Sequence, residues 1–388
     1  MYWLVRSLRI LLVAALLVFG SESWAAPADA TRGFFTADDV LRAEPSPTAE
    51  QVGRAKAGER VTVGERRGFW RFVERLQGGA GWVRLSSLRM TGAAPAAGLA
   101  AVASARDASG NIVLSSGTRS VLGRNAPLNS ETLTTVRPVS NVLSSLGVPN
   151  PNPESRQRFV MEGGLQLRNL PLAAAPLPAR IDTTTETALA RELVTLVLSV
   201  ARPLPNPALQ QYVENVGQGL ASRLGGRNIE WRFVVVDSPS IVAFGLPGGF
   251  VLISRGFFDL LESEDELAAV LAREMAHVRR QHHLRNLRQP AIDTYLRPLD
   301  PALEFLADEE GVRLAARSGY DAAALIAVLE RLSSATASGA DAALLRSTMP
   351  SVADRVATLA SAVTPELEAA VGPSPAAERI KQYRTGPL

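Results

Sequence analysis

The apolar segments between Ile229 and Val278 limit the fold more than any other part of the chain. The stretch IEWRFVVVDS reads as a buried strand, and IVAFGLPGGFVLIS reads as two strands joined by a Pro-Gly-Gly turn. Ser263 and Glu266 then form a capping box, which predicts that a helix begins there. Two amphipathic patterns before the strands predict helices over 185–201 and 207–224. We therefore expect an α+β domain over residues 182–362.

The composition fits an exported globular protein. With 388 residues, 46% of them hydrophobic, the chain can bury a sizeable core. Residues 1–25 combine two early arginines with an apolar run and small residues, which predicts a signal peptide cleaved after Ala25; a retained membrane anchor is the alternative. The chain has no cysteine, so it has neither a lipid-attachment cysteine at the cleavage site nor a disulfide, and packing alone would hold its fold. We expect a soluble periplasmic protein. The net charge of +3 is small and the basic residues are spread along the chain, so nucleic acid is not an expected partner.

A small all-β barrel is expected over residues 33–90, where short apolar runs alternate with turn residues. The segment resembles bacterial SH3-like domains in its Trp70-x-x-Val73 strand and its closing Gly81-Trp82-Val83. Such domains commonly bind cell-wall or peptide ligands, so the resemblance implies the cell wall as a partner. The alternative is that Trp70 and Trp82 are core residues.

The remaining regions carry weaker signals. Residues 91–181 are rich in Ala, Ser and Pro and predict an extended connector, in which GNIVLSSGTRSVLG fits a hairpin. Residues 363–388 are expected to be a C-terminal tail.

The helix that follows the predicted strands carries a pattern one residue short of a zinc motif. In H-E-x-x-H, two histidines on one helix face bind zinc and the glutamate activates a metal-bound water. Here the order is Arg273, Glu274, Met275, Ala276 and His277. A guanidinium keeps its proton and cannot bind a cation, so Arg273 cannot be the first ligand.

A third ligand would come from LEFLADEEGVRLAARSGYD, which begins at Leu303. With the A-F-x-x-P-G-G turn and the near-motif before it, this order resembles the HtpX and CAAX-prenyl-protease type of zinc metallopeptidase, family forty-eight. The resemblance implies a mainly helical zincin-like domain with a small sheet. It implies a catalytic base at Glu274, zinc ligands at His277 and Glu304, residues near the cleft at Asp308, Met349 and Arg355, and a substrate strand at Val242, Ala243 and Phe244.

This chain departs from the family pattern at several positions. Arg273 replaces a histidine, Met349 stands where the family has T-H-P, and Val242 stands where an asparagine is common. The other histidines, His282 and His283, would point about 140° and 120° away from His277 on a continuous helix, so we expect neither to replace the lost ligand.

The charge of Arg273 suggests a different use for the site. Without a metal, the carboxylates of Glu274, Glu304 and Asp308 would repel one another in a poorly hydrated cleft. We expect Arg273 to bridge them by charge-assisted hydrogen bonds; the alternative is that its long side chain turns to solvent.

These features predict that zinc is absent or weakly bound. The chain would then be a periplasmic pseudoenzyme that holds an extended peptide or an envelope protein by strand addition. The alternative is an active zinc endopeptidase in envelope protein quality control, which would use His277, Glu304 and a substitute ligand.

Overall fold

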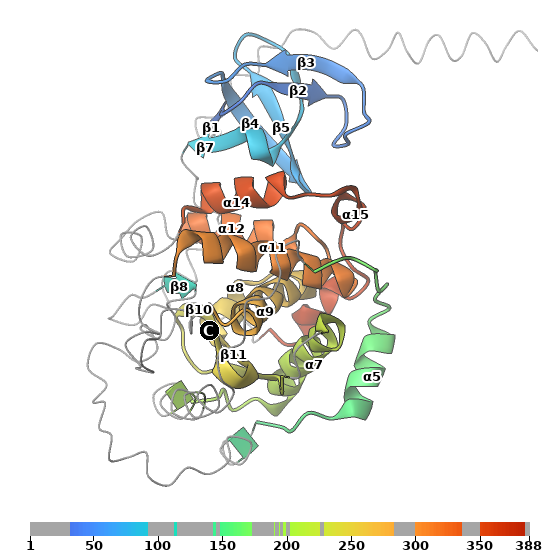
Figure 1. Cartoon of the computed structure of the whole chain (residues 1–388), viewed down its shortest axis with the longest axis vertical. Coiled ribbons are helices and arrows are strands. Elements are labelled where there is room, and N and C mark those ends of the chain that lie inside the picture. Colours follow the sequence, from blue (N-terminus) through green and yellow to red (C-terminus); the bar gives the residue numbers. More distant parts are fainter. Residues whose placement is uncertain are drawn as a thin grey trace, which may run out of the picture.

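The computed structural model describes residues 32–91, 112–114, 143–144, 148–172, 190, 194, 197–198, 202–225, 229–282, 299–335 and 350–384. The expected signal peptide, His283 and Met349 lie outside these residues. An N-terminal sheet lies at one end, followed by a layer of helices and then by a second, smaller sheet (Figure 1).

The N-terminal sheet confirms the expected all-β region. Its seven antiparallel strands follow the order β3-β2-β6-β5-β4-β1-β7. The elements are β1 (Arg32–Phe35), β2 (Asp39–Arg42), β3 (Gln51–Ala55), β4 (Arg60–Arg67), β5 (Trp70–Arg75), β6 (Ala80–Arg84), the 3-10 turn η1 (Leu85–Ser87) and β7 (Leu88–Thr91). Alternate strand residues fill its own core, which includes Phe35, Leu41, Val61, Val73 and Val83.

The second sheet has the strand order β8-β10-β11-β9. Its strands are β8 (Ile112–Leu114), β9 (Arg232–Val236), β10 (Ile241–Leu246) and β11 (Phe250–Ser254), and the turn η3 (Pro247–Gly249) joins β10 to β11. The expected pair of strands around a Pro-Gly-Gly turn is confirmed. Of the segment that fitted a hairpin, the structure describes residues 112–114, which add to β10 as a parallel strand.

The two faces of this sheet pack against different clusters, as the alternation of side chains along a strand requires. Phe233, Val235, Ala243 and Ile253 face the main core with the long helices. Val234, Val242, Phe244 and Leu252 face a second cluster with Val194, Val197 and Leu198. These last three residues are helical and buried, and they lie within the helix predicted over 185–201.

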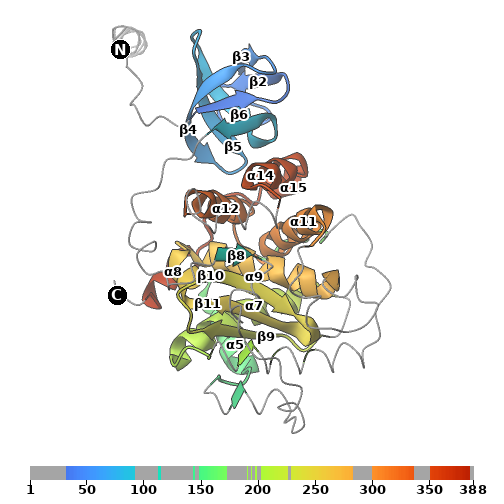
Figure 2. The ribbon, with the colours of Figure 1, turned by 90° about the vertical axis from the view of Figure 1, so that its left-hand side faces the viewer.

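Helix α9 is the centre of the larger domain, and every one of its residues is buried. It lies between the second sheet and the layer that contains α11 and α12 (Figure 2). As the sequence predicts, Ser263 caps its first turn by accepting the Glu266 N–H at 3.2 Å. The helices are α5 (Pro153–Glu162), α7 (Pro207–Leu224), α8 (Arg255–Leu260), α9 (Glu264–Arg279), α11 (Pro301–Arg317), α12 (Ala324–Ala335), α14 (Val352–Ser361), α15 (Pro365–Glu368) and the 3-10 helix η5 (Ala377–Gln382).

The C-terminal residues pack against both halves of the molecule. Arg379 in η5 donates from Nε to Glu264 in the first turn of α9 at 2.6 Å. Glu368 in α15 accepts hydrogen bonds from the Trp70 indole and, at 2.8 Å, from Arg84. Trp70 and Trp82 are both buried, as the core interpretation requires. The described part of the expected tail is therefore a structural link between the N-terminal sheet and α9.

Within the described ranges, every helix is too short or too polar to cross a membrane.

Candidate functional site

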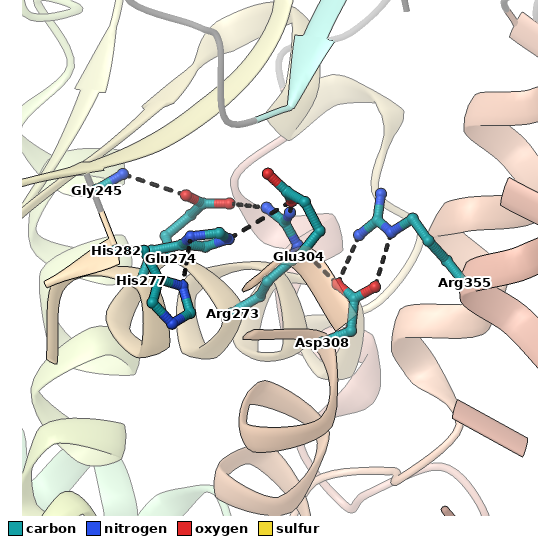
Figure 3. A network of polar contacts seen from close by, with 8 residues as sticks. All are labelled: Gly245, Arg273, Glu274, His277, His282, Glu304, Asp308 and Arg355. Carbon is teal, nitrogen blue, oxygen red and sulfur yellow. Dashed lines mark hydrogen bonds and ion pairs between the residues drawn. The ribbon is translucent and has the colours of Figure 1, made fainter. Parts of the chain in front are cut away.

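Arg273 lies at the centre of the candidate site with an exposed fraction of 0%. Its Nε donates to Asp308 at 2.8 Å, its Nη1 donates to Glu274 at 2.5 Å, and its Nη2 donates to Glu304. The guanidinium thus reaches three carboxylates, one on its own helix and two on α11 (Figure 3). The expected contacts with these carboxylates are confirmed, and the alternative in which Arg273 turns to solvent is wrong.

Asp308 continues this network to a second guanidinium. Arg355 in α14 donates from Nε and Nη2 to the two oxygens of Asp308, at 2.7 and 2.6 Å. Burial raises the pKa of Asp308, but the charges and hydrogen bonds of Arg355 and Arg273 outweigh this effect and lower it. Asp308 is therefore an ionised bridge between two arginines. The sequence placed Asp308 and Arg355 near the cleft without indicating this bidentate pair.

Two glycines let neighbouring elements approach α9 closely at this point. A Cβ at Gly311 in α11 would lie 2.7 Å from the Cα of Arg273, and one at Gly245 in β10 would lie 2.7 Å from the Glu274 carbonyl oxygen. The Gly245 N–H also donates to Glu274 Oε2 at 3.2 Å. Neither glycine was predicted from the sequence as part of the site. A glycine inside a helix or strand costs about 1 kcal/mol, which is a signal of such a close approach.

His277 sits beside the network, with its Nε2 3.7 Å from Glu304 Oε2. Its Nδ1, on the opposite side of the ring, lies 3.2 Å from Nδ1 of His282. One of these nitrogens must donate and the other accept, so the contact requires at least one unprotonated ring nitrogen. The contact with His282 at Nδ1 thus fixes the orientation of the His277 imidazole, with Nε2 facing Glu304.

This position of His282 corrects the sequence prediction, which assumed a continuous helix. Helix α9 ends at Arg279, and Gln281 has a φ of 53° that turns the chain back. Arg279 and Arg280 both bond to the buried carboxylate of Glu310, which holds the end of the helix in place. His282 therefore lies at the Nδ1 atom of His277, whereas Glu304 faces its Nε2 atom.

When all of its carboxylates and guanidiniums are ionised, the network carries one negative charge more than it has positive charges. Glu274, Glu304 and Asp308 face the guanidiniums of Arg273 and Arg355. Burial and the neighbouring charge of Glu304 raise the pKa of Glu274 to about 7, although Arg273 and the Gly245 hydrogen bond act to lower it. Burial lowers the pKa of Arg273, but the surrounding carboxylates raise it more. A proton on Glu274 makes the network neutral. Because the pKa is about 7, Glu274 binds and releases this proton near physiological pH.

The raised pKa of Glu274 predicts a pH-dependent stability. Between its ordinary value of 4.5 and about 7, the folded protein holds a proton that the unfolded chain releases, so the unfolding free energy falls as the pH rises. Glu274→Gln should remove this slope and raise stability at pH 8 by about 1 to 3 kcal/mol, with little change at pH 4.5. Chemical denaturation at both pH values measures the effect. Glu378→Gln, at an exposed position, is the control, and equal slopes in wild type and Glu274→Gln would contradict the prediction.

The residues at this site do not fit a zinc ion. His277 and Glu304 are the two expected ligands that approach each other, but Arg273 Nη2 bonds to the same oxygen of Glu304. A guanidinium has no lone pair for a metal, and its positive charge repels a divalent cation. Across the part of the chain that the structure describes, no group of three or more His, Asp or Glu side chains is arranged to hold a metal ion.

The predicted substrate strand, Val242 to Phe244, lies in β10 and is buried. The Val242 N–H donates to Ser254 Oγ at 3.0 Å, on the side of β11. The structure brings this strand next to Glu274 through the Gly245 contact. Met349, which the motif resemblance placed near the cleft, lies outside the described residues.

The comparison with protein families agrees with the metallopeptidase resemblance for the central region. Residues 207–299 match the model of Peptidase family M48. This M48-like region contains the second sheet except β8, together with α9, Glu274 and His277. It ends before Glu304, Asp308 and Arg355, so the places of those three residues rest on the motif order and on the geometry above.

Three relatives match parts of this chain. The beta-barrel assembly-enhancing protease of Escherichia coli K12 is 33% identical over 81 residues, which are 21% of this chain and 17% of the relative. The protein of that name from Yersinia pestis is 32% identical over 84 residues, 22% of this chain and 17% of the relative. The mitochondrial metalloendopeptidase OMA1 of Schizosaccharomyces pombe is 28% identical over 169 residues, 37% of this chain and 50% of the relative. The chain thus spans less than a fifth of the two bacterial relatives and half of the yeast one.

Proposed function

We propose that the chain is a periplasmic, metallopeptidase-like protein that binds an extended peptide or envelope protein and does not cleave it. The position of Arg273 carries this proposal. Its guanidinium supplies the positive charge that zinc supplies in the family, and it bonds to both the predicted base and the predicted carboxylate ligand. We infer that a structural ion-pair network has replaced the metal centre.

The state of Glu274 supports the loss of catalysis. As a general base it would have to take a proton from a metal-bound water. Instead, Oε1 accepts from Arg273 and Oε2 accepts from the Gly245 N–H. With both oxygens engaged and a guanidinium beside them, this carboxylate is held in a structural role.

An active zinc endopeptidase is the second candidate, because the relatives carry names of proteases and His277 lies near Glu304. This function requires Arg273 to leave Glu304 and another ligand to take its place. The departure would strand carboxylates in a buried site, which is costly.

Metal content and peptide hydrolysis separate the two candidates. We expect the purified protein to contain well below one zinc per chain by elemental analysis, even after incubation with zinc and desalting, because Arg273 repels the ion. We also expect no hydrolysis of unfolded protein substrates. Stoichiometric zinc, together with hydrolysis that is lost in Glu274→Gln, would establish the endopeptidase instead.

The localisation and the role of the N-terminal sheet are further parts of the proposal. Residues 1–25 have the pattern of a signal peptide, so amino-terminal sequencing of the mature protein should begin at Ala26. We propose that the N-terminal sheet, if it contacts the cell wall, does so with surfaces other than Trp70 and Trp82. Both tryptophans are buried, and Trp70 bonds to Glu368.

A further inference from the structure

The outer edge of β10 is covered by a distant segment of the same chain. Residues Ile112 to Leu114 form β8, which pairs in parallel with Ile241, Val242 and Ala243. In the sheet order, β8 is the outermost strand and β10 is the next one. Without β8, the predicted substrate strand would present an open row of backbone donors and acceptors at this edge.

The same edge of β10 also contacts Glu274. Backbone N–H groups point to alternate sides of a strand, and the Val242 N–H points toward β11, where it reaches Ser254. The N–H groups of Ala243 and Gly245 therefore point the other way, toward the edge that β8 covers. At Gly245 this donor is already bonded to Glu274 Oε2. The edge of β10 that β8 covers therefore continues to Gly245, whose N–H binds the predicted base, Glu274.

The bond between Gly245 and Glu274 limits how far a parallel strand can pair along this edge. An occupant that continued in parallel register past Leu114 would come opposite Gly245 two residues later, where the outward donor is taken. Ladder pairing on this edge is therefore limited to the stretch Ile241–Ala243. This stretch fits three residues in extended conformation, and Ile112, Val113 and Leu114 are residue types that favour strands or apolar surroundings.

We infer that residues 112–114 are a built-in occupant of the peptide-binding edge of β10, and that an external aliphatic segment binds there by displacing them. This inference rests on the proposed function, in which β10 holds an extended peptide. The partner it fits is an extended chain with about three consecutive aliphatic residues that runs parallel to β10. The internal segment sets a threshold that an external peptide must exceed.

The size of this threshold follows from competition within one chain. A tethered segment has an effective concentration on the order of millimolar. If the same sequence binds as a free peptide with a dissociation constant of about 100 μM, the tethered copy weakens external binding about tenfold. Such a modest effect suits a three-residue strand, which makes few hydrogen bonds.

The first test measures binding of a fluorescent peptide with the sequence NIVLSS, residues 111–116, by anisotropy. The triple variant Ile112→Gly/Val113→Gly/Leu114→Gly should bind it about tenfold more tightly than the wild type. Val121→Gly/Leu122→Gly, in the same connector, is the matched control and should behave as the wild type. A peptide with proline in place of valine loses a backbone donor and should bind poorly to all of them. Equal affinity of the wild type and the triple variant would overturn the inference.

The second test locks the occupant in place. Leu114→Cys/Ala243→Cys joins registered partners on neighbouring strands, which lie about 4.8 Å apart, within the range that a disulfide bridges. Because the chain has no cysteine of its own, the new bond is the only one that can form. The oxidised protein should lose peptide binding and regain it on reduction. Unchanged binding in the oxidised, cross-linked protein would count against the inference.

These tests remain separate from the question of catalysis. Zinc content is measured on the same samples, and a protein with stoichiometric zinc would contradict the loss of the metal centre while still showing displacement at β10. A zinc-free protein with no displacement would contradict only the inference about residues 112–114.

Discussion

Replacing Arg273 with alanine should lower the free energy of unfolding by about 3 to 5 kcal/mol. The side chain is fully buried and is the common partner of three carboxylates. Its removal leaves Glu274 and Glu304 without their arginine partner, in a place that water does not reach. Urea denaturation of the wild type and the variant at pH 7.5 measures this loss.

The control for this variant is Arg67→Ala. Arg67 pairs with Glu65 at 2.8 Å, but both side chains are more than half exposed, at 60% and 58%. Exposed ion pairs contribute about 0 to 1 kcal/mol, so the control should change stability little. A loss below about 1 kcal/mol for Arg273→Ala as well would mean that the guanidinium does not hold the network together.

The buried strands and the helix start were predictable because their signals are local. The Pro-Gly-Gly turn, the capping box at Ser263 and the alternation in the N-terminal sheet each depend on residues a few positions apart. The pairing of β8 was not predictable in the same way. The sequence suggested a local hairpin in the segment that contains β8, but the partner of β8, β10, lies far along the chain.

The position of His282 shows why the helix end was missed. Residues 280–289 contain no glycine or proline to signal a stop, so the helical pattern appeared to continue. What ends the helix is a tertiary contact, in which Glu310 of α11 takes hydrogen bonds from Arg279 and Arg280. A contact between two elements cannot be read from the pattern of one of them.

The charged centre of the site was predictable to a greater degree. Three carboxylates and one arginine in place of a ligand leave few ways to balance charge in a buried cleft, and Arg273 was expected to bridge them. The spacing of the motif could not show the bidentate pair of Arg355 with Asp308, or the Gly245 donor to Glu274. Those contacts depend on how closely α14 approaches α11 and β10 approaches α9.

Arg273→His should convert this network into a zinc site. The substitution removes the buried cation and places an imidazole four residues before His277, on the same face of α9, with Glu304 opposite. We expect about one zinc per chain by elemental analysis. Zinc at 100 times its dissociation constant should stabilise the variant by about 2.7 kcal/mol, an effect that a chelator reverses.

A carboxylate-deficient variant separates coordination by the new histidine from weak surface binding. Arg273→His/Glu304→Gln keeps both histidines but lacks the third ligand, so its zinc content and its zinc-dependent stabilisation should both fall sharply. Hydrolysis is not expected to return in Arg273→His, because Val242 and Met349 also differ from the family pattern. If Arg273→His folds but takes up no more zinc than the wild type, the loss of the metal centre extends beyond one residue. The positions of His277 and Glu304 would then have adapted to the guanidinium.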